Sequence, residues 1–237
     1  MKTSLFLTIA VFFLFVPETF AQVHAYVQMD FSGPIEFLVT DSQGERCGCI
    51  LGQGAYYQEI PYAGYGDGSE EGSREFAFRG ALTDTAFSTT YTIQVFGTAN
   101  DVFTGDGGGR QTWSGKGGGF HTIGVIGLNQ TVTYVFNYST DSTVTPTFMK
   151  VVTPQIIRQD FDNCSKLKII KDAQLCSNLG NILTAFQKDL AKGDSVSARQ
   201  QIVLFQQTLG SDSAVLVYTY AWSILQEDSK YIIANCR

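Results

Sequence analysis

The chain has 237 residues, enough for two small domains, and its 16 Lys and Arg against 22 Asp and Glu give a net charge of −6. Binding to nucleic acid depends on clustered Lys and Arg, so an acidic chain without a basic stripe argues against a nucleic-acid partner. The acidic excess lies before position 155, since residues 22–154 hold 6 basic against 13 acidic residues and residues 155–237 hold 9 against 8.

Residues 1–21 are predicted to be a signal peptide. Lys2 supplies the positive charge, Leu5–Val16 is an apolar run of twelve residues, and Thr19 and Ala21 put small residues at a cleavage site. Twelve residues are too few to cross a hydrocarbon layer about 30 Å thick, which takes about twenty. We therefore expect export to the extracellular space or to the periplasm and cell envelope, with no membrane span after cleavage.

Residues 22–140 are predicted to form an antiparallel β-sandwich of the immunoglobulin or jelly-roll kind, in which roughly seven to nine strands fit. Apolar and polar residues alternate along short stretches, as in strands with one face on a core, and Gly-rich turns separate them. Asp41 and Gly44 bracket a tetrapeptide that favours a type I turn. The predicted strands are Val23–Met29, Ile35–Thr40, Ala55–Ile60, Arg74–Arg79, Thr90–Val95, Phe120–Ile126 and Thr131–Tyr138.

The Gly-rich stretch Thr104–Gly119 is predicted to be a flexible hairpin tip that exposes Trp113. An exposed aromatic ring there, with Arg110 nearby, could stack on a sugar. The alternative is that Trp113 folds back on the core. The stretch lacks a G-x-x-x-x-G-K-[ST] motif and a following helix, so no nucleotide is expected, and we predict no cofactor.

A second loop offers a candidate calcium site through the carboxylates of Asp67, Glu70 and Glu71. These residues lack the D-x-D-x-D-G spacing of a dedicated calcium loop, and solvated acidic residues are the alternative interpretation. Beyond this candidate we expect no metal, because the only histidines, His24 and His121, are far in sequence from every cysteine.

Three stretches of this half resemble a β-sandwich module of secreted bacterial proteins in both order and spacing. They are PIEFLVTDSQGER at 34–46, YQEIPYAGY at 57–65 and YTIQVFGT at 91–98. The chain departs from that module in its Cys47-Gly48-Cys49 sequence and in its longer glycine loop. The resemblance implies a non-catalytic appendage outside the cytoplasm, and it defines no ligand residue.

Residues 161–237 are predicted to form an antiparallel bundle of three to four helices, joined to the sandwich by a linker at 141–160. Apolar residues recur every three or four positions, and Gly193-Asp194 and Gly210-Ser211 supply helix ends followed by helix caps. The spacing predicts main helices of about 16, 15 and 23 residues after a short first helix around Ser165–Lys171.

This half is similar to the small helical domain named FIMAH. The similarity covers LGNIL at 179–183, FQKDLAKGD at 186–194, ARQQIVLF at 198–205 and AWSILQEDSKYII at 221–233. The resemblance implies a C-terminal domain of secreted bacterial enzymes and surface proteins whose proposed role is binding or attachment.

Five cysteines lie after the signal peptide, and export permits disulfides. The odd number leaves at least one thiol unpaired or available for a thiol-linked dimer. Antiparallel helices bring the start of the short first helix near the C-terminus, so we expect a disulfide between Cys164 and Cys236. The alternative is a bond between Cys164 and Cys176.

The sequence lacks a G-x-S-x-G motif, and no nucleophile is paired with a base at a recognisable spacing. We therefore expect a secreted, non-catalytic protein that binds an extracellular glycan or protein surface. The alternatives are a structural subunit of an envelope or matrix, and a hydrolase or calcium-dependent function within the β half.

Overall fold

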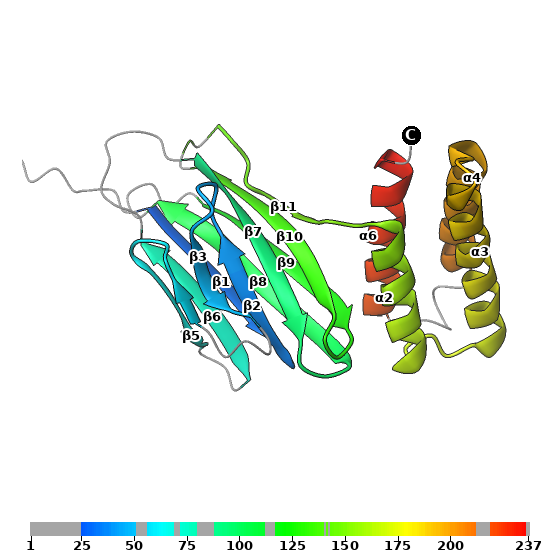
Figure 1. Cartoon of the computed structure of the whole chain (residues 1–237), viewed down its shortest axis with the longest axis horizontal. Helices are drawn as coiled ribbons and strands as arrows, with labels where there is room; N and C mark the ends of the chain where they lie inside the picture. Colours follow the sequence, from blue (N-terminus) through cyan, green and yellow to red (C-terminus); the bar gives the residue numbers. More distant parts are fainter. Residues whose placement is uncertain are drawn as a thin grey trace, which may run out of the picture.

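The computed structural model describes residues 25–50, 56–68, 72–79, 88–111, 117–139, 141, 143–211 and 219–235. Over these residues the chain is a mixed α+β protein with two antiparallel sheets and four helices (Figure 1). The predicted signal peptide lies outside the described residues, as do Trp113, Glu70, Glu71 and Cys236.

Over the described residues the two sheets contain eleven strands, whereas the sequence predicted roughly seven to nine. The first sheet has the order β5 (Ala63–Asp67), β6 (Ser73–Arg79), β1 (Ala25–Ser32), β8 (Asp101–Gln111) and β9 (Gly117–Ile126). The second has the order β11 (Thr147–Lys150), β10 (Thr131–Ser139), β7 (Ser88–Gly97), β2 (Ile35–Thr40), β3 (Arg46–Cys49) and β4 (Tyr56–Gln58). Their inner faces share one hydrophobic core, in which Phe31 of β1 lies 4.9 Å from Phe37 of β2 between ring centroids.

Local patterns of the sequence are confirmed where the alternation is regular. In β10 the apolar positions Val132, Tyr134, Phe136 and Tyr138 are all buried and the residues between them are not. The expected turn after β2 also forms, because the Gly44 N–H donates to the Asp41 carbonyl at 3.1 Å. The Asp41 carboxylate accepts two further N–H groups in the same turn.

The prediction of a flexible tip over Thr104–Gly119 was wrong for most of that stretch. Strand β8 continues to Gln111 and β9 begins at Gly117, and the two pair residue by residue. The glycines leave room for aromatic rings. A Cβ at Gly105 would overlap the ring of Phe31, and one at Gly109 would overlap the ring of Tyr138. A glycine that accommodates a ring in a strand has the same sequence signature as a glycine in a loop.

The four helices are α2 (Pro154–Lys166), α3 (Ala173–Ala191), α4 (Ser195–Ser211) and α6 (Thr219–Asn235). Contacts join α3 to α4, α4 to α6, and α2 to both α6 and α3. The predicted break before α4 is confirmed, since Gly193 has φ of +77° and the Asp194 carboxylate accepts the Ser197 N–H at 2.9 Å.

The segment between the two halves differs from the expected linker at 141–160. It contains β11, which pairs with β10, and the first half of α2. Thr153 caps α2 by accepting the Ile156 N–H at 3.2 Å, with Pro154 in the first turn. Ser165, expected near the start of a short helix, lies at the end of α2 instead.

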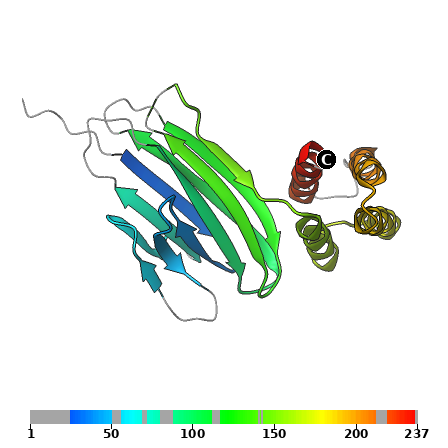
Figure 2. The same ribbon diagram turned by 45° about the horizontal axis from the view of Figure 1, so that its top comes forward.

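Helices α2 and α6 pack against β9, whereas α3 and α4 lie on the side away from the sheets (Figures 1 and 2). Val125 of β9 is buried in the same hydrophobic cluster as Ile157 of α2 and Ile224 of α6. A hydrogen bond of 2.7 Å from the Asn163 amide to the Gln130 side chain joins α2 to the turn after β9. The helices and the sheets therefore share buried surface.

Among the described residues, no disulfide joins any two of the four cysteines Cys47, Cys49, Cys164 and Cys176. The alternative bond between Cys164 and Cys176 is not formed, and the Cys176 thiol lies 3.1 Å from the Ser165 hydroxyl. The predicted bond from Cys164 to Cys236 stays a prediction, because Cys236 lies outside the described residues.

Candidate functional site

The site residues expected from the sequence are not brought together where the structure describes them. Arg110 stands near the end of β8, opposite Tyr26 of β1. Asp67 ends β5, which β6 and β1 separate from β8 in the first sheet, and its carboxylate pairs with Arg74 at 2.9 Å. The remaining candidates, Trp113, Glu70 and Glu71, lie outside the described residues, so the sugar and calcium hypotheses at these positions stay predictions.

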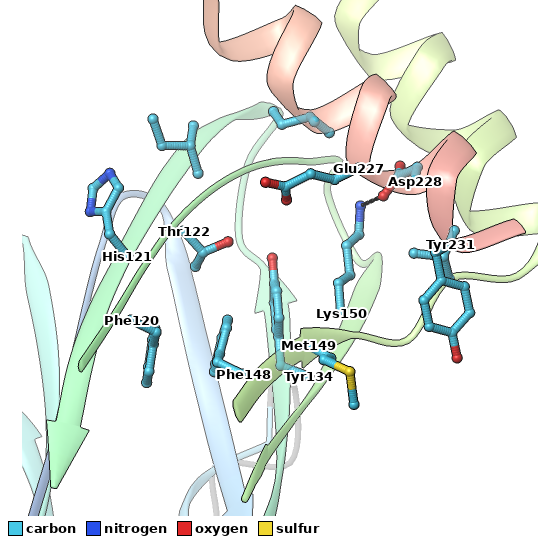
Figure 3. Close-up of a pocket in the computed structure, with 13 residues that line it drawn as sticks. Phe120, His121, Thr122, Tyr134, Phe148, Met149, Lys150, Glu227, Asp228 and Tyr231 are labelled. Atoms are coloured by element: carbon cyan, nitrogen blue, oxygen red, sulfur yellow. Dashed lines mark hydrogen bonds and ion pairs between the residues drawn. The ribbon is translucent and has the colours of Figure 1, made fainter. Parts of the chain in front are cut away.

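A cleft of about 320 Å³ lies where the helices meet the edges of the two sheets (Figure 3). Strand β9 is the last strand of the first sheet and β11 is the last strand of the second, and α6 covers the opening between them. The residues that line the cleft are Phe120, His121, Thr122, Ile123, Tyr134, Phe148, Met149, Lys150, Val152, Ile224, Glu227, Asp228 and Tyr231.

Three stacked aromatic rings from three strands form one wall of the cleft. The rings of Phe120 and Phe148 lie 3.6 Å apart at an angle of 6°, and those of Tyr134 and Phe148 lie 4.8 Å apart at 18°. Tyr134 is buried, whereas Phe120 and Phe148 are half-buried. Phe148 is therefore the central ring of a partly exposed stack that spans both sheets.

A buried group of three charged side chains lies at the base of the cleft. The Lys150 ammonium of β11 contacts the Asp160 carboxylate of α2 and lies 2.8 Å from the Asp228 carboxylate of α6. The exposed fractions of the three side chains are 14%, 2% and 1% respectively. Removing charges from water is costly unless they are paired, so this triad ties both helices to the sheet only while its charges balance.

One proton balances the charges of the triad. Burial raises the pKa of Asp160 well above its usual range and the Asp228 carboxylate raises it further, while Lys150 only partly opposes both effects. Burial alone would lower the pKa of Lys150, but the two carboxylates outweigh it and raise that pKa. A single proton on this pair of carboxyl groups, beside the charged Lys150, makes the group neutral.

The orphaned oxygen of Asp228 fits this assignment. Within the part of the chain that the structure describes, its Oδ2 atom is buried and accepts no hydrogen bond. A proton on Asp160 supplies a hydrogen-bond donor to the Asp228 carboxyl group, because the two groups lie within hydrogen-bonding reach.

Polar groups lie beside the aromatic stack. The Tyr134 hydroxyl is hydrogen-bonded to Thr122, and burial raises the pKa of Tyr134, so the hydroxyl is a neutral donor. Both hydroxyls point toward the centre of the cleft on the side of the exposed Glu227 (Figure 3). His121 turns to the outer face of the first sheet, where its ring nitrogen lies 2.7 Å from Asp106. The cleft thus offers apolar ring faces next to hydroxyl donors and a carboxylate acceptor.

Sequence reasoning missed the triad, although two of its members carry a signal. Asp160 lies between the buried Ile157 and Phe161, and Asp228 lies three residues after the buried Leu225. A charged residue on the apolar face of an amphipathic helix must find a partner or remain neutral. No local pattern identifies Lys150 as that partner, because the pairing depends on how β11 lies against the helices.

Within the described ranges, no helix is both long and apolar enough to cross a membrane. The same residues contain no group of three or more His, Cys, Asp or Glu side chains arranged to bind a metal ion. Comparison of the chain with protein-family models, with curated proteins and with solved structures finds no match. The resemblances noted in the sequence therefore stay expectations.

Proposed function

We propose that the protein is a secreted, non-catalytic binding protein that attaches to an extracellular polysaccharide through the cleft between β9, β11 and α6. In this proposal the sandwich is one domain and the antiparallel bundle of α2, α3, α4 and α6 is the other. The observation that carries it is the partly exposed stack of Phe120, Tyr134 and Phe148 beside the hydroxyl and carboxylate groups of the cleft.

The chemistry of the cleft matches that of a sugar ring. A pyranose has an apolar C–H face that packs on an aromatic ring, and a rim of hydroxyl groups that need donors and acceptors. The ring of Phe148 supplies the first kind of contact, and Thr122 and Glu227 supply the second. Small-ligand sites commonly combine a mostly apolar lining with a few polar groups in this way.

The buried charges favour binding over hydrolysis. Glycoside hydrolysis uses two carboxyl groups that flank the bond, about 5 to 10 Å apart. Asp160 and Asp228 instead contact the same Lys150 ammonium, and 2% or less of either side chain is exposed. They hold the helices against the sheet, and they are not free to act on a substrate.

The test is a binding measurement by affinity electrophoresis on a panel of soluble polysaccharides, using the chain from Gln22 onward. We expect Phe148→Ala to weaken binding about tenfold, the size of one aromatic contact. Glu227→Gln is expected to weaken it as well, without a change in stability, because Glu227 is exposed. Glu45→Gln in the β2–β3 turn is the matched control. Wild-type binding to none of the panel, or equal binding by both cleft variants, would reject the proposal.

A further inference from the structure

The opposite side of the sandwich carries the two most exposed large hydrophobic side chains among the described residues. Tyr56 of β4 is 70% exposed, and Tyr62 in the turn before β5 is 74% exposed. Strands β4 and β5 are the last strands of the second and first sheets, at the edges farthest from α6. Two exposed rings at one open edge form an aromatic surface that is separate from the cleft.

The backbone at Tyr62 is one that glycine would suit better. The Ala63 N–H donates to the Ile60 carbonyl at 3.2 Å, Pro61 holds the second position of the turn, and Tyr62 in the third has φ of +61°. This is the pattern of a type II turn, whose third position favours glycine. A bulky residue at positive φ is strained, so the stability of the turn does not account for a tyrosine at this position.

The second ring, that of Tyr56, packs against a side chain that both sheets hold in place. Tyr56 lies 6.0 Å from the ring of Tyr65, which packs edge-on against Phe37 at 5.0 Å. The Tyr65 hydroxyl donates to the Glu36 carboxylate of β2, across the two sheets. Tyr56 is therefore presented to solvent on a support that both sheets hold in place.

The charges around this surface limit what can bind there. Arg46 pairs with Glu59 at 2.7 Å, and Arg74 pairs with Glu36 at 3.2 Å and with Asp67 at 2.9 Å. In the part of this surface that the structure describes, these two guanidinium groups against three carboxylates leave one negative charge, which disfavours an anionic ligand. The paired charges also leave the rings as the main contact surface.

We propose that Tyr56 and Tyr62 form a second binding surface, for an uncharged polysaccharide. Each ring packs on the apolar face of one sugar residue, while each phenol hydroxyl exchanges hydrogen bonds with sugar hydroxyls. Two separate exposed rings suit an extended polymer better than a single sugar, because each ring engages its own residue of the chain.

The test is a depletion assay with amorphous cellulose and chitin as the neutral probes and polygalacturonate as the anionic one. We expect binding to at least one neutral probe, with Tyr56→Ala and Tyr62→Gly each weakening it about tenfold. Tyr62→Gly is expected to keep or raise the melting temperature, because glycine relieves the turn, so its loss of binding would not come from unfolding.

The cleft variant Phe148→Ala separates this surface from the cleft. Binding that is weakened by Tyr62→Gly and Tyr56→Ala supports the surface, whether or not Phe148→Ala weakens it too. Binding weakened by Phe148→Ala alone assigns it to the cleft and overturns this inference. Failure to bind either neutral probe, or tighter binding to polygalacturonate, also overturns it. Sedimentation could instead show a dimer that Tyr62→Gly dissociates. That result would mean that the surface binds a second copy of the chain, and it would overturn the inference.

Discussion

Two neutral substitutions within the buried triad are expected to differ in their effect on stability. Lys150→Met leaves a buried carboxylate on Asp228 without its counter-charge, which costs about 3 to 5 kcal/mol. In Asp160→Asn, the asparagine side chain has the shape of a protonated aspartic acid and keeps a hydrogen-bond donor for Asp228. The variant is therefore expected to be as stable as the wild type at pH 7, or more stable.

The raised pKa of Asp160 determines how the free energy of unfolding changes with pH. The pKa of Asp160 is raised in the folded protein above its ordinary value of 3.8. The stability that this group contributes is therefore fully present below pH 3.8 and is lost as the pH rises toward the folded pKa. Asp160→Asn removes that loss. Relative to the wild type, the variant is expected to gain up to about 1.4 kcal/mol per pH unit above pH 4.

Urea unfolding followed by far-UV circular dichroism at pH 5, 6, 7 and 8 measures both effects. The midpoint concentration and the slope are compared for the wild type and the two variants. Two results would refute the reasoning. One is that Asp160→Asn destabilises the protein as much as Lys150→Met does at pH 7. The other is that the difference in free energy of unfolding between Asp160→Asn and the wild type does not change with pH. Either would mean that Asp160 is ionised in the folded protein.

Further predictions concern the strands, a helix cap and a buried thiol. Gly109→Ala is expected to lower the free energy of unfolding by about 1 to 3 kcal/mol, because its Cβ overlaps Tyr138, whereas Gly64→Ala, with open space around it, is expected to be neutral. Calorimetry that finds equal melting temperatures for these two variants would contradict the packing argument. Asp194→Ala removes the cap of α4 and is expected to lower the midpoint of urea unfolding, and a midpoint unchanged within error would show that the cap does not stabilise the fold. Burial raises the pKa of the Cys47 thiol to about 11, so iodoacetamide at pH 8 should label it only after denaturation, as peptide mass spectrometry can check.

Regular local patterns were enough to predict some elements closely. The alternation along Thr131–Tyr138 predicted β10, and Ile35–Thr40 forms a strand with the predicted bounds. The Gly193-Asp194 sequence predicted a helix break and a cap, because both depend on backbone groups within one turn. Such features need no knowledge of the rest of the chain.

The same reasoning failed where the cause lies far away in sequence. Strand β11 is a short edge strand that exists because β10 offers it a partner, and Pro154 begins a helix in a range that resembled a linker. The Gly-rich strands of the β8–β9 hairpin have the sequence of a loop, because the rings that fill the glycine positions come from other strands.

Local spacing and summed charge were enough to predict a mixed α+β chain, several strands and helix ends, and a net negative charge. The cleft and the triad depend instead on how distant elements pack. Lys150 and Asp228 are 78 positions apart, and they meet only because β11, α2 and α6 converge on the edge strand β9. A local pattern can show that a buried carboxylate needs a partner, but the packing of distant elements decides which residue that partner is.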